Sequence, residues 1–416
     1  MTKIKTLHAR EVLNSRGLPA VEAEVSVEGR SPNVSQFFRA ISPEGASKGK
    51  YEAVELKDGG SRYHGLGVQH AVDNINKIIS RKLVGMELDQ GKVDGTLCSL
   101  AGDRKWKLGG NATTAVSMAA CKAVGDVSAA IGKMSGSKLS IPVPFSLIVE
   151  GGAHAGNDLN VQEFMVVPLK TGSFKEALRA VSEIYYTLEE MVLKKYGKGA
   201  TNVGYEGGFA LQISDTKDAL DMISRAIGEA GYSKEVKIAI DSAATQFFNG
   251  NYNIDGKRLS AVQLADYYIE LSKIYPLVSI EDPFSEDDFD SFALLRKKAK
   301  RLLVVGDDLT VTNPGRIKKA IEKDSCNTLL VKVNQIGTVS EAVGAATLAG
   351  NNDWDIIVSH RGGDSEDTFI ADFSVGLGAL GAKFGAPMRG ERTAKYNQLL
   401  RLEEQGLPYA GKRFKL

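Results

Sequence analysis

The sequence predicts an α/β protein in which a (β/α) barrel follows a smaller α+β domain. Three observations support this prediction. An early segment alternates polar and apolar residues, later apolar runs alternate with amphipathic segments, and each later run ends on a polar residue. The chain has 416 residues, which is long enough for two or three domains.

The N-terminal part is typical of an antiparallel sheet followed by helices. Apolar and acidic or hydroxyl residues alternate from Val21 to Glu28, as in a strand with one solvated face. A Gly-rich loop spans Ser42 to Gly49, and helical patterning follows. Gly, Ser and Pro are frequent between Met134 and Pro144. We therefore expect an α+β domain at residues 1–134 and a barrel domain at residues 140–416.

One helix of the second domain can be delimited from the sequence. Ser173 and Glu176 form an S-x-x-E pattern that predicts a capping box, and Gly197 is expected to end the helix. The apolar residues between them keep helical spacing: Leu178, Val181, Ile184, Tyr185, Leu188 and Val192.

Apolar runs without alternation predict parallel strands that are covered on both faces. They are Lys237–Asp241, Val278–Glu281, Leu302–Asp307, Leu329–Lys332 and Ile356–His360. Each run ends on a polar functional group, and Lys383 follows within Gly381–Gly385. From Glu281 onward these groups recur at intervals of roughly 25 residues, enough for a strand, a helix and short loops. Strand ends converge on one rim in a barrel but not in an open doubly wound sheet, which favours the barrel.

Three carboxylates at these strand ends predict a metal site. Asp241, Glu281 and Asp307 would repel one another at one rim, and a hard divalent cation removes that repulsion. Oxygen ligands without cysteine favour Mg²⁺. The alternative is that each acid caps a helix or faces solvent. Asp282 and Asp308 are interpreted as helix caps or as groups behind the ligands.

Two lysines at strand ends predict proton-transfer chemistry. Lys332 and Lys383 occur where a solvated lysine would be out of place. Beside a metal cation and a second lysine, the pKa of an amine falls, and the amine can act as a base. The alternative is a structural ion pair with a rim acid. Two lysines facing three metal-binding acids indicate proton abstraction next to a carboxylate, which gives a doubly charged enolate.

Further polar residues occur in contexts that suit a substrate site. Arg361, after His360 and before two glycines, suits a phosphate or a carboxylate. Glu206 lies between glycines and Glu163 enters an apolar run, and either could be a general acid if its pKa is raised. The glycines around His154 would let its loop close over a ligand. Each of these residues could instead be structural.

Composition excludes several other classes of protein. Lys and Arg total 52 against 51 Asp and Glu, which gives no support to a nucleic-acid or polybasic membrane role. The first residues lack the apolar core of a signal peptide, and no apolar run reaches the ~18 residues of a membrane span. Cys98, Cys121 and Cys326 make no metal-ligand pattern and suit a reducing compartment. We therefore expect a cytosolic enzyme.

Long strings of the sequence resemble the enolase family from end to end. They are Ala9–Gly17, Ser279–Pro283, Gly306–Pro314, Val331–Thr338 and Lys395–Glu404. The resemblance implies a small N-terminal α+β domain, a C-terminal (β/α)8 barrel of the TIM type, and a homodimer. It also implies interconversion of 2-phosphoglycerate and phosphoenolpyruvate in glycolysis, with Mg²⁺ as cofactor.

The resemblance also implies a role for individual residues. Asp241, Glu281 and Asp307 match the ligands of the tighter Mg²⁺, and Ser47 matches the loop serine that reaches a second Mg²⁺. For catalysis, Lys332 matches the base at carbon 2, and Glu206, supported by Glu163, matches the acid that helps to expel the carbon-3 hydroxyl. For the substrate, Lys383 matches the lysine that binds its carboxylate. The groups that match other substrate contacts are His154, His360 and Arg361, with Arg361 on the phosphate.

The chain also departs from the family pattern near this site. Tyr205 and Gly362 replace an Asp and a Ser, and the remaining departures are Glu44, Lys48, Glu150 and Gln246. Losing a hydroxyl bond to a charged group costs about 1.5–3 kcal/mol, or about tenfold to hundredfold in affinity. These departures motivate an alternative function, a catalytically weakened homologue with a binding or scaffold role. A different lyase on the same barrel is disfavoured by the retained surroundings of Lys332 and Lys383.

Overall fold

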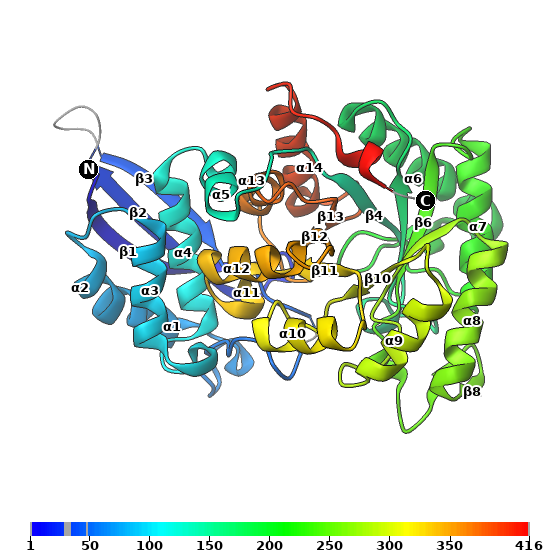
Figure 1. Ribbon diagram of the computed structural model, residues 1–416, viewed down its shortest axis with the longest axis horizontal. Helices are drawn as coiled ribbons and strands as arrows, with labels where there is room; N and C mark the ends of the chain where they lie inside the picture. The colour runs from blue at the N-terminus through cyan, green and yellow to red at the C-terminus, as the bar shows by residue number, and fades with distance from the viewer. Residues whose placement is uncertain (1, 29–34, 47–48, 415–416) are drawn as a thin grey trace.

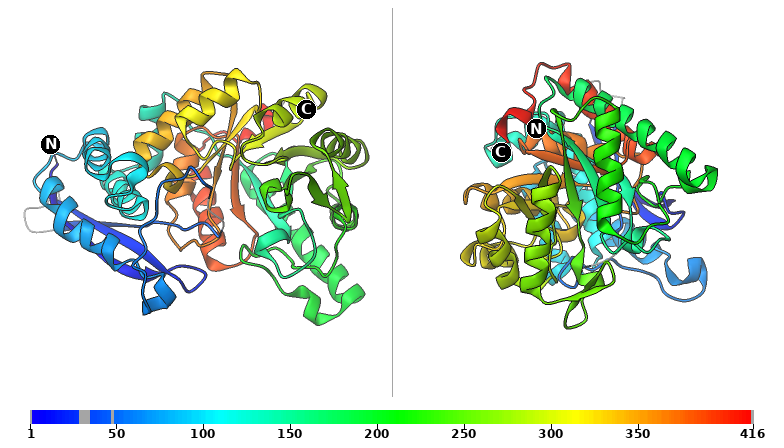
Figure 2. Two further views of the ribbon diagram at one scale, coloured as in Figure 1. Left: turned by 90° about the horizontal axis from the view of Figure 1, so that it is seen from below. Right: turned by 90° about the vertical axis from the view of Figure 1, so that its right-hand side faces the viewer.

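The computed structural model describes residues 2–28, 35–46 and 49–414. Ser47 and Lys48 therefore lie outside the described residues. Figure 1 shows two bodies side by side, a sheet with helices built from the N-terminal third of the chain and a barrel built from the rest. The second set of views shows the same division (Figure 2).

The N-terminal body is an antiparallel three-stranded sheet with helices on one side. The strand order is β1-β2-β3, with bounds Ile4–Leu13, Pro19–Glu28 and Ser35–Ile41. The apolar residues of the alternating segment are buried, as predicted, and α4 packs against β2 and β3. The helices are α1 (Gln69–Asn74), α2 (Ser80–Leu83), α3 (Gln90–Ala101), α4 (Gly110–Val124) and α5 (Val127–Ser135), with a π-helical segment at Ile75–Ile79 between α1 and α2.

The second body is a closed eight-stranded barrel, which confirms the predicted fold class. The order around the barrel is β10-β11-β12-β13-β4-β5-β6-β9. The strands are β4 (Val143–Glu150), β5 (Glu163–Pro168), β6 (Val236–Asp241), β9 (Leu277–Glu281), β10 (Leu303–Gly306), β11 (Thr328–Val331), β12 (Asp355–Ser359) and β13 (Gly381–Gly385). A small hairpin of β7 (Tyr252–Ile254) and β8 (Lys257–Leu259) follows β6.

Helices connect the strands and cover the outside of the barrel (Figures 1 and 2). They are α6 (Phe174–Tyr196), α7 (Thr216–Glu229), α8 (Ala261–Ile274), α9 (Phe289–Lys298), α10 (Pro314–Glu322), α11 (Val333–Ile336), α12 (Val339–Gly350), α13 (Phe369–Gly376) and α14 (Gly390–Glu403). Ser173 caps α6 through the N–H of Glu176, as predicted, and Gly197 ends the helix. The carboxylate of Glu176 pairs with Arg179, so the second bond of the predicted capping box is replaced by an ion pair.

One strand departs from the regular alternation of parallel strands and helices. β5 runs antiparallel to both β4 and β6, and two helices follow it before β6 begins. The register aligns Glu150, Glu163 and Asp241 across the three strands. Because β5 is reversed, Glu163 reaches the functional rim from the start of its strand, where the other strands present their ends. This reversal explains why Glu163 enters an apolar run instead of closing one.

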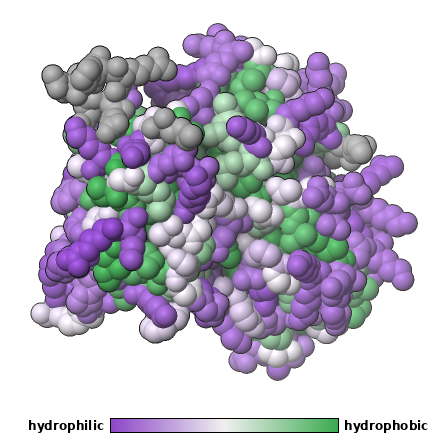
Figure 3. Space-filling view, turned by 60° about the vertical axis from the view of Figure 1, so that its left-hand side comes forward, coloured by the Kyte–Doolittle hydropathy of each residue, from purple (hydrophilic) through white to green (hydrophobic). Residues whose placement is uncertain are grey.

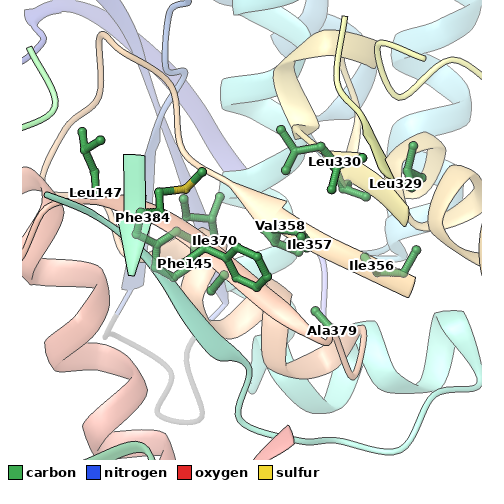
Figure 4. Packing of buried hydrophobic residues seen from close by; sticks show 14 of the residues in the cluster. Phe145, Leu147, Leu329, Leu330, Ile356, Ile357, Val358, Ile370, Ala379 and Phe384 are labelled. Atoms are coloured by element: carbon green, nitrogen blue, oxygen red, sulfur yellow. The ribbon is translucent and has the colours of Figure 1, made fainter. Parts of the chain in front are cut away.

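Apolar side chains fill the space between the barrel strands and the surrounding helices. Figure 4 shows Phe145 and Phe384 between Leu147 on one side and Val358 and Ile357 on the other. The whole of β4 and of β5 is buried, and each fully buried large side chain contributes about 1.5–3 kcal/mol. The predicted helices and strands therefore enclose a continuous core that fixes the strand ends.

The surface carries both hydrophilic and hydrophobic side chains (Figure 3). On the face in Figure 3, hydrophilic side chains surround smaller hydrophobic areas. Within the described ranges, no single helix is long and apolar enough to cross a bilayer. α4 and α5 meet the criterion only together, as a pair bent by 103°, and most residues of α4 are buried inside the protein.

Candidate active site

Three acids meet at the carboxyl ends of neighbouring barrel strands. Asp241 ends β6, Glu281 ends β9, and Asp307 directly follows β10. Asp241 and Glu281 are register partners, and all three side chains are buried. The structure therefore brings the predicted metal-ligand residues to one rim, as convergent strand ends require.

Lys383 joins two of these acids and a third from β5. Its Nζ donates to Asp241 Oδ2 and Glu281 Oε1, both at 2.8 Å, and lies 3.1 Å from Glu163 Oε1. Burial lowers the pKa of Lys383, but the charges of Asp241, Glu163 and Glu281 outweigh it and raise the pKa well above its usual value. Burial and the Asp241 charge likewise raise the pKa of Glu281.

Lys332 pairs with the remaining acid. Its Nζ donates to Asp307 Oδ2, and Gln335 Nε2 donates to Asp307 Oδ1 at 2.8 Å. Burial lowers the pKa of Lys332, but the carboxylates that face the amine, Asp307 first and then Glu281, together outweigh burial and raise it. This direction differs from the lowered pKa expected beside a metal cation, because carboxylates are the charges that face the amine here. The ion pairs of the alternative interpretation are therefore present at both lysines.

The donor set fits a hard divalent cation. Asp241, Glu281 and Asp307 supply carboxylate oxygens from three adjacent strands, and oxygen-only sets are the ones Mg²⁺ prefers. Glu281 resists ionisation beside Asp241, and added positive charge would relieve that repulsion. Among the described residues, two groups bring their possible ligand atoms within 4.8 Å of one another: Asp282 with Asp307 and Asp308, and His154 with Glu163 and Glu206. In the first group, Asp282 accepts N–H bonds from Asp307 and Asp308 at 3.1 and 2.7 Å, in a turn and not at the start of a helix, so it lies behind the predicted ligand Asp307 and is no helix cap.

Glu206 lies between two histidines. Its Oε2 is 3.1 Å from His360 Nε2, and its Oε1 is 3.6 Å from His154 Nδ1. Arg392 Nη1 lies 2.7 Å from His360 Nδ1. Arginine can only donate, so His360 accepts at Nδ1 and carries its proton on Nε2, toward Glu206. Burial lowers the pKa of His360 to about 4, against the opposing charge of Glu206, so the ring is neutral at pH 7.

The two candidate general acids differ in pKa. Burial raises the pKa of Glu163 well above its usual range, and Lys383 only partly opposes this. Burial would also raise the pKa of Glu206, but His360 and His154 outweigh burial and hold it well below its usual range. The raised pKa considered for Glu206 is therefore wrong in this structure, since two imidazoles face its carboxylate. Within the described residues, Glu163 Oε2 and both ring nitrogens of His154 lack hydrogen-bond partners, which suits a polar ligand.

Arg361 is held by a residue of the N-terminal body. Its Nη1 and Nη2 donate to the two carboxylate oxygens of Glu52 at 2.8 and 3.2 Å, and Nη1 also donates to Asn334. Both members of the pair are buried. Glu52 was not among the predicted site residues, because it belongs to no strand end and no short motif. A phosphate at Arg361 would have to share the guanidinium with Glu52.

The N-terminal body also forms part of the cavity wall. Gly45, Ala46 and Glu52 line the same cavity as the predicted barrel residues, of which Glu281 alone is set back from the wall. Glu44 and Gly363 exchange two backbone hydrogen bonds, at 2.7 and 2.8 Å, so the loop is tied to the barrel. Gly362 allows this approach, because a Cβ there would lie 2.9 Å from the Cβ of Ala46.

The other departures from the family pattern have identifiable contacts. Tyr205 is 43% exposed, its ring lies 4.7 Å below the guanidinium of Arg16, and its edge faces His154. Gln246 donates to Gln162 at 2.7 Å and accepts from the N–H of Ala153 at 3.2 Å. Glu44 pairs with Lys57 at 3.0 Å. These substitutions therefore surround the cavity without displacing the rim acids or the lysines.

Arg392 is a further residue that the sequence analysis missed. It is fully buried in α14 and also donates to the carbonyl oxygens of Tyr205, Arg361 and Gly362. It therefore holds the Glu206 loop and the His360–Gly362 segment together. The sequence indicates Arg392 only through helical spacing, because it lies on the same face of the helix as the buried residues Tyr396 and Leu399.

Comparisons with known proteins agree with this geometry. Residues 4–130 match the family model "Enolase, N-terminal domain", and residues 138–415 match "Enolase, C-terminal TIM barrel domain". The chain is 49% identical to the enolase of Methanothrix thermoacetophila, over 99% of each chain, and 49% identical to that of Methanococcoides burtonii, over 96% of this chain and 95% of the relative. It is 48% identical to the enolase of Methanocaldococcus jannaschii, over 99% and 98%. On the strength of both family models and these full-length similarities, the chain belongs to the enolase family.

Proposed function

We propose that the protein is a phosphopyruvate hydratase, which interconverts 2-phosphoglycerate and phosphoenolpyruvate. The observation that carries the proposal is the meeting of Lys332 and Lys383 with three carboxylates at the ends of adjacent strands. Such an arrangement suits removal of a proton next to a carboxylate. The names of the full-length relatives support the same reaction.

The proposed roles follow from where each group lies. Lys332 removes the proton at carbon 2, and Lys383 binds the substrate carboxylate. Glu206, between His154 and His360, helps the carbon-3 hydroxyl to leave, and Glu163 supports it, since its raised pKa lets it hold the proton that the departing hydroxyl needs. Arg361 binds the phosphate, for which a guanidinium supplies paired donors. Ser47 is proposed to reach a second metal ion.

Asp241, Glu281 and Asp307 would hold Mg²⁺ at the rim. When bound, the ion supplies positive charge that stabilises the negative charge developing on the substrate carboxylate. Lys383 and Lys332 pair with the same acids. We expect both lysines to exchange these ion pairs for contacts with the substrate.

The scaffold alternative has less support than catalysis. It was motivated by the departures around the site, and these surround a rim whose acids and lysines remain in contact with one another.

We also propose a homodimer, a cytoplasmic location, two Mg²⁺ sites, a role in glycolysis, and domain boundaries at residues 1–134 and 140–416. These proposals are based on the family resemblance and the sequence pattern.

The test of the proposed function is formation of phosphoenolpyruvate from 2-phosphoglycerate by the purified protein with and without Mg²⁺. Ultraviolet absorbance follows the product directly. We expect Mg²⁺-dependent turnover, and a Lys332→Ala variant should lose about 10²–10⁴-fold, the usual contribution of a general base. A wild-type protein that turns over no faster than Lys332→Ala would defeat the proposal.

A further inference from the structure

A buried carboxyl group lies directly under the loop that carries Glu206. Glu150 ends β4 and is fully buried. It also departs from the family pattern, which has Asn at this position. Its side chain lies behind Glu206 as seen from the cavity, and it does not line that cavity. The proposed chemistry therefore gives Glu150 no direct contact with the substrate.

The carboxyl group binds backbone N–H groups of the Glu206 loop. Its Oε2 accepts from the N–H of Gly208 at 3.1 Å and from the N–H of Glu206 at 3.2 Å. Its Oε1 also accepts from the Glu206 N–H, at 3.1 Å, so both oxygens share that N–H group. A buried N–H left without an acceptor costs about 1–3 kcal/mol, so these bonds determine where the loop can lie.

The glycines around Glu206 fit this arrangement. A Cβ on Gly204 would lie 2.5 Å from Cδ of Glu150, and a Cβ on Gly208 would lie 3.0 Å from its Cβ. Neither distance leaves room for a larger residue without movement. The glycines thus allow the loop to rest on the carboxyl group, which gives a structural reason for the Gly204–Gly208 sequence.

Other contacts of the same loop involve its carbonyl oxygens. The Tyr185 hydroxyl donates to Gly207 O at 2.8 Å, Arg392 donates to Tyr205 O, and the N–H of Ala386 donates to Glu206 O at 3.0 Å. Glu150 complements them by accepting from the N–H groups. The peptide of Glu206 is thereby held from both sides, and its side chain is aimed between the two histidines.

The protonation of Glu150 follows from its surroundings. Burial and the charge of Glu206 raise its pKa to about 8, while the two N–H groups and Arg392 oppose the shift. Tyr185 is the other titratable group beside it, and the Tyr185 pKa is itself raised, mainly by burial. The carboxyl group is therefore mostly protonated at pH 7. Oε2 accepts from both N–H groups and Oε1 from that of Glu206 only, so Oε1 is the oxygen on which we place the proton.

We propose that Glu150 is a positioning residue that sets the location of the Glu206 carboxylate by binding the N–H groups of Glu206 and Gly208. This inference rests on the proposed function, because Glu206 matters through its action on the substrate hydroxyl. It concerns the chemical step and not substrate binding, since Glu150 contacts neither Arg361 nor Lys383 in the described structure.

The test compares Glu150→Gln with Glu150→Leu. Glutamine resembles the protonated acid, and its oxygen can take the place of Oε2 and keep both N–H bonds. Leucine removes both bonds at similar volume. At pH 7 we expect Glu150→Gln to keep kcat within about threefold, and Glu150→Leu to lose on the order of 10²-fold in kcat with KM nearly unchanged, as expected for a misplaced catalytic group. The matched control is Asp94→Asn, which changes a buried carboxyl that also accepts a backbone N–H and should leave kcat unchanged.

The inference is overturned if Glu150→Leu folds and keeps the wild-type kcat, or if Glu150→Gln falls as far as Glu150→Leu. If Glu150→Leu does not fold, the pH profile of kcat decides. The kcat of the wild type should change with pH at an apparent pKa near 8, and the kcat of Glu150→Gln should lack that change. Identical pH profiles overturn the inference.

A wild type that forms no phosphoenolpyruvate overturns the proposed function instead. Amide hydrogen exchange then still tests Glu150, because Glu206 and Gly208 should exchange slowly in the wild type and faster in Glu150→Leu.

Discussion

The barrel and the N-terminal body contribute to the candidate site in different ways. The barrel supplies charged groups at the ends of strands, where a buried core fixes their positions, as with Asp241 and Glu281, and it supplies Lys383 from within β13. The N-terminal body supplies a loop and one carboxylate, Glu52, which reaches across to Arg361. The barrel thus fixes the groups that are proposed to react, whereas the N-terminal body pairs with the arginine that is proposed to bind the phosphate.

The largest expected effect is on the barrel side, at Lys383. Lys383→Ala removes the cation between Asp241, Glu281 and Glu163 and the group proposed to bind the substrate carboxylate. We expect kcat/KM to fall by about 10³-fold or more, since positioning and charge stabilisation are lost together. Steady-state kinetics measures this, with Lys297→Ala, an exposed lysine of α9, as the control. A loss below tenfold would contradict the role of Lys383.

A smaller but distinct effect is expected at the junction of the two bodies. Glu52→Gln removes the charge that pairs with Arg361 inside the protein. Breaking a buried ion pair costs about 3–5 kcal/mol, so thermal unfolding should occur at lower temperature. Arg361 would also be released to bind an anion, and we expect KM for 2-phosphoglycerate to fall. A raised KM together with unchanged stability would show that Glu52 does not compete for Arg361.

The sequence predicted the barrel half of the site and missed most of the rest for a physical reason. A strand end is recognisable because an apolar run stops at a polar residue, and the five groups at strand ends indeed converge with Lys383 of β13. Glu52 lies in a loop, and its partner is 309 positions away, so no local pattern reveals it. The reversal of β5 was missed as well, because a short apolar strand reads the same in either direction.

A third prediction concerns the contact of α3 with α12, which joins the N-terminal body to the barrel. Asp94 accepts from Gln90, Ser117 and the N–H of Ser340, and burial raises its pKa. Because the pKa of Asp94 is higher in the folded than in the unfolded protein, protonation of Asp94 stabilises the fold at pH values below the unfolded pKa of about 4. This stabilisation is lost as the pH rises through the folded pKa. Asp94→Asn should lack this dependence.

Denaturant titrations at several pH values measure the difference between the wild type and Asp94→Asn. That difference should shift in favour of the variant as the pH rises above about 4. A difference that is constant with pH would mean that Asp94 titrates alike in the folded and unfolded states.

The smallest effect is expected at Gly362, where the two bodies come closest. If the missing hydroxyl limits the enzyme, Gly362→Ser should improve KM while Gly362→Ala does not. The 2.9 Å approach to Ala46 predicts instead that both variants push the loop away and lower kcat/KM by about tenfold. Parallel kinetics of the two variants separate these outcomes, and an improvement in Gly362→Ser alone would favour the hydroxyl.

The most direct measurement is a crystal soaked with Mn²⁺ in place of Mg²⁺, in which anomalous scattering locates the ion. We predict one strong peak bound by carboxylate oxygens of Asp241, Glu281 and Asp307, with Lys383 no longer bridging the first two. A rim without a peak at saturating Mn²⁺, with Lys383 still bound to Asp241 and Glu281, would contradict the view that these strand ends form a metal-binding catalytic centre.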